Sequence, residues 1–293
     1  MIGKRSTGSA VFDAANYAIL TALVIVCVYP VYYVVAASVS NPVALYRGSK
    51  FLLWPREFSL ATYKLVFQYP AIWTGYANTL LYVGAGVAIS LALTVCGAFG
   101  LSRSYLIGRV AITMFIVFTM YFSGGMIPSF LLIRSLGMYD SRWAMLLPGA
   151  VSTFNLIIML TYFRGIPESL EEAAKIDGAS EYRILCTVYL PLCAPVLAVI
   201  ALYYAVAKWN SYFQALIYLR SRTSYPLQLI LREILIQNDQ SMVSGGGAYD
   251  GLEAYAQNVK YASIVVATVP ILTMYPFLQK YFVKGIMIGA VKG

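Results

Sequence analysis

Few residues of this sequence could do chemistry, and their spacing does not form a catalytic site. The 293 residues include 12 Asp and Glu, 21 Lys and Arg, four Cys and no His. An acid, a base, a nucleophile or a metal site needs several such groups close together. The cysteines form no CxxC pair and lie mostly in apolar stretches, at Cys27, Cys96, Cys186 and Cys193. We therefore predict no catalytic residue, no metal site and no disulfide framework.

A nucleotide-binding loop is missing from the sequence as well. The only Gly-Lys pair is Gly3-Lys4, which Arg5 follows, so no GxxxxGK[ST] phosphate loop exists. The chain is expected to bind no cofactor and not to be an enzyme by itself. If it drives uphill transport, another subunit must supply the energy.

Charged residues gather in one stretch, PESLEEAAKIDGASEYRILCTVYLP, residues 167–191. Ser169 with Glu172 three residues later is the pattern of an N-cap and its capping box. Gly178 stands where a left-handed residue would end a helix and turn the chain. The pattern predicts a short helix over residues 169–178.

A helix of this length needs a surface to pack against, because isolated helices shorter than about 12 residues rarely persist in water. Ala173 and Ala174 give it a low-relief face, and Leu170 and Ile176 supply apolar contacts. The residues alone leave two partners open. One is a groove on another protein, and the other is this protein's own surface or the lipid headgroups.

The chain around this helix has the composition of an integral membrane protein. Hydrophobic residues make up 60% of it and charged residues 11%, and the mean hydropathy is +0.72. We expect an all-α integral membrane protein whose residues 1–293 form a single transmembrane domain. Apolar runs long enough to cross a bilayer predict six transmembrane helices, near 14–39, 76–101, 110–133, 143–163, 184–207 and 261–282.

The loops between these spans indicate the orientation. An even number of spans puts both termini on one side, and the Lys and Arg of the loops favour the cytoplasm. The helix over 169–178 would then be cytoplasmic, between the fourth and fifth spans. Apart from Lys280, no span contains Asp, Glu, Lys, Arg or His, so coupling to a proton gradient is not evident. A sodium-coupled secondary transporter for a neutral polar solute is the alternative, because carbonyls and hydroxyls can bind sodium.

Polar and aromatic residues in two spans are candidates for contact with a solute. Asn155 lies inside the fourth span, where an amide is costly unless it is paired or faces a wet cavity. An interhelical hydrogen bond and a sugar contact both remain open for it. The candidates at the outer end of the fifth span are Tyr203, Tyr204, Trp209 and Asn210. Tyrosine suits sugar rings, but it is also common at membrane interfaces.

The charged stretch also carries a motif. Glu172-Ala173-Ala174, Gly178 four positions after Ala174, and then Val188 and Leu190-Pro191 resemble the EAA signature of ATP-binding-cassette import permeases. That signature is EAA, three residues, Gly, nine residues and I-x-LP, and this sequence departs from it at Val188. The resemblance implies the type I importer transmembrane fold, with the short helix as the coupling helix that docks on an ATPase subunit. The implied docking positions are Ser169, Glu171, Glu172, Ala173, Ala174, Asp177, Gly178 and Ala179.

The C-terminal residues 284–293, KGIMIGAVKG, resemble the ending of the smaller permease subunit of maltose-type carbohydrate importers. In that subfamily the tail reaches the ATPase dimer interface, which implies contacts for Gly289, Val291, Lys292 and Gly293. The resemblance is nearest to a branch that imports oligosaccharides, with acidic ones such as alginate fragments among them.

The resemblance implies alternating access in a multi-subunit importer of the bacterial cytoplasmic membrane. The implied partners are a second homologous permease, two ATPase subunits that carry ATP and Mg, an extracytoplasmic solute-binding protein, the oligosaccharide and membrane lipid. Nucleic acid is not expected, because the basic residues behind the net charge of +9 are scattered and form no basic stripe.

Overall fold

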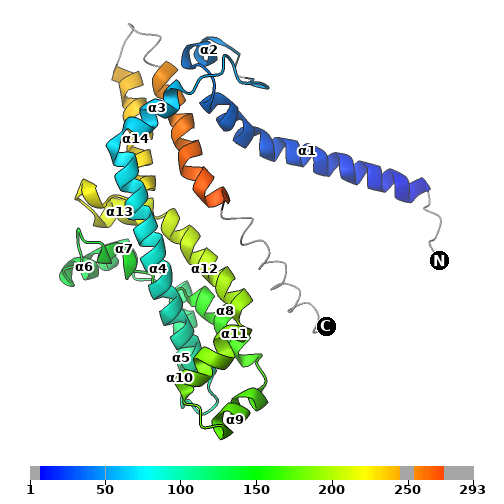
Figure 1. Ribbon diagram of the computed structural model, residues 1–293, viewed down its shortest axis with the longest axis vertical. Coiled ribbons are helices and arrows are strands. Elements are labelled where there is room, and N and C mark those ends of the chain that lie inside the picture. The colour runs from blue at the N-terminus through cyan, green and yellow to red at the C-terminus, as the bar shows by residue number, and fades with distance from the viewer. Residues whose placement is uncertain (1–6, 50, 245–253, 274–293) are drawn as a thin grey trace. The chain divides into compact units, whose positions relative to one another are not determined.

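The computed structural model describes residues 7–49, 51–244 and 254–273, and the regular elements of these ranges are all helices (Figure 1). In chain order they are α1 (Thr7–Ser38), α2 (Pro42–Arg47), α3 (Ala61–Gln68), α4 (Pro70–Ser102), α5 (Arg109–Tyr121), α6 (Met126–Ser135), α7 (Trp143–Leu146), α8 (Thr153–Arg164), α9 (Glu168–Ile176), α10 (Glu181–Ile184), the π-helix η1 (Leu185–Tyr189), α11 (Leu190–Leu192), α12 (Ala194–Trp209), α13 (Tyr212–Tyr218), the 3-10 helix η2 (Arg222–Ser224), α14 (Leu227–Ser244) and a helix over 254–273.

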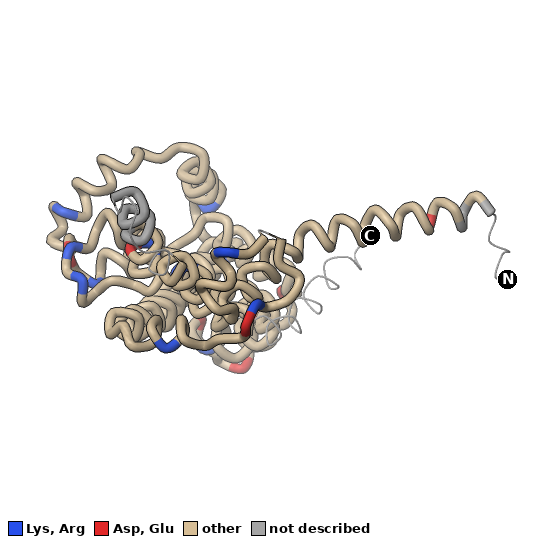
Figure 2. The backbone as a smooth tube through the Cα atoms, turned by 90° about the horizontal axis from the view of Figure 1, so that it is seen from above, with Lys and Arg blue, Asp and Glu red and all other residues tan. Residues whose placement is uncertain are grey.

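The chain divides into two compact units. One comprises Met1–Tyr69 with Glu233–Thr268, and the other comprises Pro70–Arg232 with Val269–Gly293. Charged residues are sparse along the backbone of the described residues (Figure 2), as the composition requires.

The first unit is organised around the C-terminal end of α1. Ala36 and Ala37 are buried there against Leu52. The last carbonyls of a helix lack partners within the helix, and here the amide of Asn258 donates to the carbonyls of Ala37 (3.3 Å) and Ser40 (2.9 Å). A side chain from the helix over 254–273 thereby caps a helix that is distant in the sequence.

The second unit is built on α4, which packs mainly against α8 and α12. Its core includes Ala98, Met159, Phe163 and Ile200, all of them nearly inaccessible to solvent. Gly86 of α4 lies against the aliphatic stem of Lys208, where a Cβ would come within 3.1 Å of it. A Cβ at this position would require the Lys208 stem to shift by a few tenths of an ångström, so glycine favours the close approach of α4 and α12.

Among the described residues, two helices are long and apolar enough to cross a membrane, Val11–Ser38 of α1 and Pro70–Ser102. These match the predicted spans 14–39 and 76–101. Two further pairs of helices pass the same test only when taken together, and both are sharply bent. The last predicted span, 261–282, begins inside the helix over 254–273, and its remainder lies outside the described residues, as does the tail 284–293.

The prediction of one continuous helix over 110–133 is wrong. The segment is divided into α5 and α6, which meet at 114°. Gly125 between them has φ +86°, a left-handed conformation that an L-residue rarely adopts. Pro128 in the first turn of α6 has no N–H, so it cannot continue the hydrogen-bond ladder of α5.

The predicted spans over 143–163 and 184–207 are interrupted too. The first is divided into α7 and α8 by a segment that contains Pro148 and Gly149, and Gly149 has φ +69°. In the second, Glu181–Leu192 and Ala194–Trp209 meet at 85°. Pro191 lacks the N–H that would bond four residues back, and the wider π-helical turn η1 comes directly before α11, which contains it.

Two side chains of α12, one turn apart, satisfy the backbone groups that the break between α7 and α8 leaves open. Lys208 Nζ donates to the carbonyls of Met145 (2.6 Å) and Leu146 (3.3 Å). The Tyr204 hydroxyl accepts the N–H of Ser152 (3.0 Å) and shares a hydrogen bond with Thr94 Oγ1 (2.7 Å). Unpaired backbone groups are costly in an apolar surrounding, so α12 stabilises the broken conformation.

Replacing Tyr204 by Phe removes only the side-chain hydroxyl and leaves the Ser152 N–H without its acceptor. We expect the free energy of unfolding to fall by about 1–3 kcal/mol, measured by thermal or denaturant unfolding of the purified protein in detergent. Tyr203→Phe is the matched control, because Tyr203 is 40% exposed. Equal stability of Y204F and Y203F would contradict this role of Tyr204.

Candidate coupling helix and solute cavity

The short helix α9 begins one residue earlier than predicted. Pro167 occupies the N-cap position, so Ser169 lies in the first turn and caps nothing, and the predicted capping box with Glu172 does not form. A proline already holds the φ value of a helix, so the chain can enter the helix directly after it. The predicted end is confirmed, because Gly178 has φ +76° and its N–H donates to the Lys175 carbonyl (3.0 Å).

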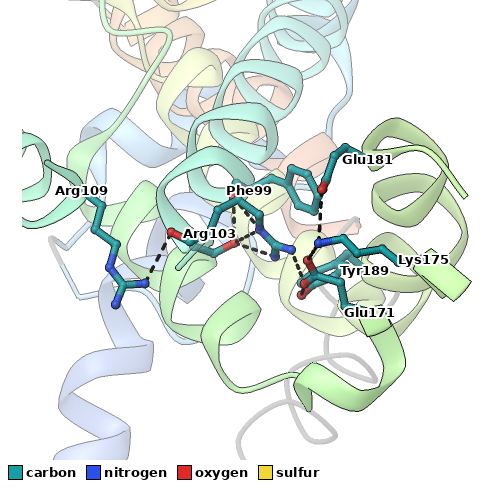
Figure 3. A network of polar contacts seen from close by, with 8 residues as sticks. Phe99, Arg103, Arg109, Glu171, Lys175, Glu181 and Tyr189 are labelled. Carbon is teal, nitrogen blue, oxygen red and sulfur yellow. Dashed lines mark hydrogen bonds and ion pairs between the residues drawn. The ribbon is translucent and has the colours of Figure 1, made fainter. Parts of the chain in front are cut away.

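Glu171 anchors α9 to the rest of the second unit (Figure 3). Its carboxylate forms an ion pair with Arg103, which follows α4, and another with Lys175 one turn along α9 (2.7 Å). It also accepts the hydroxyl of Tyr189 in η1 (2.8 Å). One carboxylate therefore joins three elements, α4, α9 and η1.

Arg103 completes this network from the end of α4. Its Nε donates to the carbonyl of Phe99 (3.3 Å), and its guanidinium lies over the rings of Phe99 (4.3 Å) and Tyr189 (4.7 Å). Arg164 donates to the carbonyl of Leu101, and Arg109 donates to that of Arg103 itself (both 3.4 Å). Three arginines thus meet the carbonyls at the C-terminal end of α4, where the helix dipole favours positive charge.

The network shifts the pKa of both charged partners. Burial alone raises the pKa of Glu171, but the hydrogen bonds from Lys175, Tyr189 and Arg103 outweigh it and lower the pKa from 4.5 to about 2. Burial alone lowers the pKa of Arg103, yet its interactions with Tyr189 and Glu171 raise it overall. Both groups therefore remain charged at neutral pH.

The predicted docking positions, which lie on α9 and in the turn after it, divide into a covered set and an exposed set. Glu171, Ala174 and Ala179 are partly covered, and both alanines pack against the core of the second unit. The remaining predicted positions are exposed in the chain alone, at Ser169, Glu172, Ala173, Asp177 and Gly178. The apolar Ile176 is 86% exposed. The helix α9 thus packs partly on its own protein and leaves a face exposed, while docking of that face on another protein stays a prediction.

A cavity of about 400 Å³ lies between α9 and the end of α4. Its wall carries both charges, with Arg103, Arg109 and Lys175 among the cations and Glu168 and Glu172 among the acids. Such a mixed surface suits polar contact with another protein rather than the binding of a single ion. Among the described residues, no group of Asp, Glu, Cys and His could hold a metal ion.

A second cavity, of about 330 Å³, lies beside the break between α7 and α8, and we call it the solute cavity. The structure brings three of the predicted solute residues to it, Asn155, Tyr203 and Tyr204. Its wall is completed by Gly149, Ser152, Phe154 and Ala207. The Tyr204 hydroxyl is bonded to the backbone N–H of Ser152 at the break. The side-chain polar groups of Tyr203 and Asn155 remain available to a solute.

Two predicted solute residues do not reach this cavity. Trp209 is buried on another side of α12, where its ring meets Tyr76 with 6.5 Å between centroids. Asn210 comes after the last residue of α12, and its amide donates to the carbonyl of Val206 (2.9 Å). The predicted tail contacts Gly289, Val291, Lys292 and Gly293 lie outside the described residues.

The sequence did not identify Arg103, Tyr189 or Lys208 as functional. Arg103 is separated from Glu171 by 68 positions. In the sequence, Arg103 is only a basic residue directly after a long apolar helix, and such a residue is ordinary in a membrane protein. Lys208 comes directly after the predicted span 184–207, where a charged residue is ordinary, yet it is buried.

Comparison with known proteins places the chain among transport permeases. Residues 71–288 match the family of binding-protein-dependent transport system inner membrane components. The polygalacturonan/rhamnogalacturonan transport system permease protein YtcP of Bacillus subtilis (strain 168) is 43% identical, over 96% of this chain and 98% of that protein. The arabinooligosaccharides transport system permease protein AraQ of Halalkalibacterium halodurans is 28% identical, over 92% of each.

A solved structure agrees with these relatives. A chain of the bacterial ABC transporter involved in the import of the acidic polysaccharide alginate superposes with a TM-score of 0.86. It is 35% identical to this chain, and the match covers 96% of this chain and 99% of that one. The all-helical architecture described above is therefore that of an ABC importer permease.

Glu171→Gln should remove stability in a pH-dependent way. Because the pKa of Glu171 is lowered on folding, its contribution is complete above pH 4.5 and is lost as the pH falls toward 2. We expect the variant to lose up to about 3 kcal/mol of unfolding free energy at neutral pH, and the difference from wild type to shrink with acidification. Unfolding in detergent from about pH 6 to about pH 3 measures both quantities.

Glu172→Gln is the matched control, since it removes the exposed neighbouring carboxylate. It should stay within about 0.5 kcal/mol of wild type. The anchoring role of Glu171 is wrong if E171Q and E172Q behave alike.

Proposed function

The chain belongs to the family of binding-protein-dependent transport system inner membrane components, and from this premise we propose that it is one of two permease subunits of an ATP-driven oligosaccharide importer. One observation carries the proposal. The helix α9 is fixed to the permease by Glu171 on one side and exposes Glu172, Ala173 and Ile176 on the other. A short helix held from within and free on its outer face is suited to dock in a groove of another subunit.

In this proposal α9 is the coupling helix, and ATP with Mg binds to two partner ATPase subunits. ATP binding closes the ATPase pair and displaces α9. The Glu171 carboxylate passes the displacement to Arg103 at the end of α4 and to Tyr189 in η1. Both elements lead into the core that α4, α8 and α12 share. The push on α9 therefore moves the helices of the membrane core together rather than α9 alone.

The same push biases access to the solute. A ligand shifts an equilibrium between two states only through its different affinity for them. ATP supplies this difference on the cytoplasmic side, and a solute-binding protein supplies it on the other side. The solute cavity beside α8 would then open alternately to each side, with a second, homologous permease completing the path.

The proposed topology is six spans in one transmembrane domain, 1–293, with both termini in the cytoplasm. It is supported by two long apolar helices, by two bent pairs of apolar length, by the segment α7–α8 and by the helix over 254–273, in which the sixth predicted span begins. Prolines and glycines are tolerated at such breaks when neighbouring helices satisfy the backbone, as Tyr204 and Lys208 do here. We propose the tail 284–293 as a second ATPase contact.

The proposed solute is an oligosaccharide with acidic sugars. The support is the chemistry of the substrates of similar proteins. The permease that is 43% identical belongs to a polygalacturonan/rhamnogalacturonan transport system, and the similar solved chain belongs to a transporter involved in the import of the acidic polysaccharide alginate. Tyr203 and Asn155 at the solute cavity can contact a sugar ring and its polar substituents.

The function is tested by purifying the chain with the proteins that co-purify with it from its native membrane, adding a solute-binding protein, and reconstituting them in liposomes. Uptake of an acidic trisaccharide such as trigalacturonate should require both ATP and the binding protein. Uptake without ATP but with a sodium gradient would instead favour a secondary transporter and overturn the proposal.

Gly178→Val tests the coupling helix. No atom lies within 4 Å of the added Cβ, so the change acts through the positive φ, which costs a β-branched residue about 1–2 kcal/mol. We expect the complex to assemble and to hydrolyse ATP, while uptake per ATP falls about tenfold. Gly178→Asn is the control, because Asn tolerates the left-handed conformation and should retain uptake. Normal coupling in G178V would contradict the assignment.

A further inference from the structure

The start of α8 leaves backbone donors unpaired beside the solute cavity. Two N–H groups of this first turn are satisfied, since Ser152 N donates to Tyr204 and Asn155 N donates to the Ser152 hydroxyl (3.4 Å). Within the described ranges, no hydrogen bond is formed by the N–H of Thr153 or Phe154. The N-terminal end of this 12-residue helix therefore carries open donors and a partial positive charge.

Asn155 provides an independent sign of a missing partner. Its side chain is buried to all but 4%, and its amide forms no hydrogen bond to any described residue. The residue lines the solute cavity. Neither amide atom is among the fully enclosed atoms that lack a partner, so both retain access to open space. Buried amides are normally paired, and the open position next to this one is the cavity.

The wall of the solute cavity contains nothing that would repel an anion. Its seven residues include no Asp or Glu, and Tyr203 adds a hydroxyl on a ring that is 40% exposed. Directly after the lining residue Ala207 comes Lys208, whose amine binds two carbonyls and has no carboxylate partner in the part of the chain that the structure describes. The described wall of the cavity thus offers hydrogen-bond donors and carries no carboxylate.

From these observations we infer that the solute cavity is a carboxylate subsite, in which the start of α8 and the Asn155 amide bind the acid group of a uronic sugar. The Asn155 amide N–H₂ and the backbone N–H of the lining residue Phe154 donate to the carboxylate oxygens, and hydrogen bonds to a charged acceptor are stronger than neutral ones. The Tyr203 ring faces the sugar. The inference rests on the proposed function and adds the chemical group that this subunit recognises.

Two variants of Asn155 distinguish a carboxylate from a sugar hydroxyl. Asn155→Leu removes the amide at similar size, and Asn155→Asp replaces it by a negative charge. A carboxylate subsite predicts that uptake falls about tenfold in N155L and further in N155D, because like charges repel. A hydroxyl site predicts the reverse order, because a carboxylate accepts hydrogen bonds from hydroxyls. Asp also suits the first turn of a helix, so misfolding would not explain its loss.

The measurement is ATP-dependent uptake of trigalacturonate by the complete importer in liposomes, with the binding protein present. Thr161→Val is the matched control, since it exchanges polar for apolar on the same helix at an exposed position away from the cavity. It should keep uptake within about twofold of wild type.

The result expected is the order wild type, N155L, N155D. The subsite is overturned by any result in which N155D transports as well as N155L, and the import function then still stands if the wild-type complex accumulates the probe. Absence of ATP-dependent uptake in the wild-type complex would overturn the proposed function and this inference with it.

Discussion

The ion pair between Arg103 and Glu171 is the interaction on which the packing of α9 against the end of α4 depends. Both side chains are largely removed from solvent, at 5% and 14% exposure, and a charge in such a place is tolerated only when it is paired. Breaking a buried pair from one side typically costs about 3–5 kcal/mol, because the other charge remains uncompensated. That magnitude is large enough to hold a nine-residue helix that would not persist alone.

The second constraint is that no backbone group can be left unpaired in an apolar surrounding. The break between α7 and α8 leaves carbonyls unpaired on one side and N–H groups unpaired on the other. Lys208 and Tyr204 of α12 form hydrogen bonds with groups of both kinds. These two side chains do not pair all the N–H groups. Phe154, whose N–H stays unpaired at the start of α8, lines the solute cavity together with Asn155, whose side chain lacks a partner among the described residues.

The two regions share their supporting helices. The end of α4 carries Arg103, and Thr94 two turns earlier on the same helix bonds to Tyr204 at the break. Tyr189 of η1 packs in the same core cluster as Tyr204 of α12. Packed helices and hydrogen bonds therefore connect the network at Glu171 with the elements around the solute cavity.

The sequence by itself determined what depends on local pattern. Composition and apolar run length predicted a membrane protein, Gly178 predicted the end of α9, and the spacing from Glu172 to Pro191 identified the family to which the chain belongs. The interruption of three spans was less accessible, because proline and glycine mark where a helix can break but not whether neighbours will satisfy the break. Only the tertiary structure decided that Arg103 meets Glu171 and that Asn155 is left unpaired. The physical reason is that pairing depends on which distant groups packing brings within hydrogen-bond distance, and a local pattern does not contain that information.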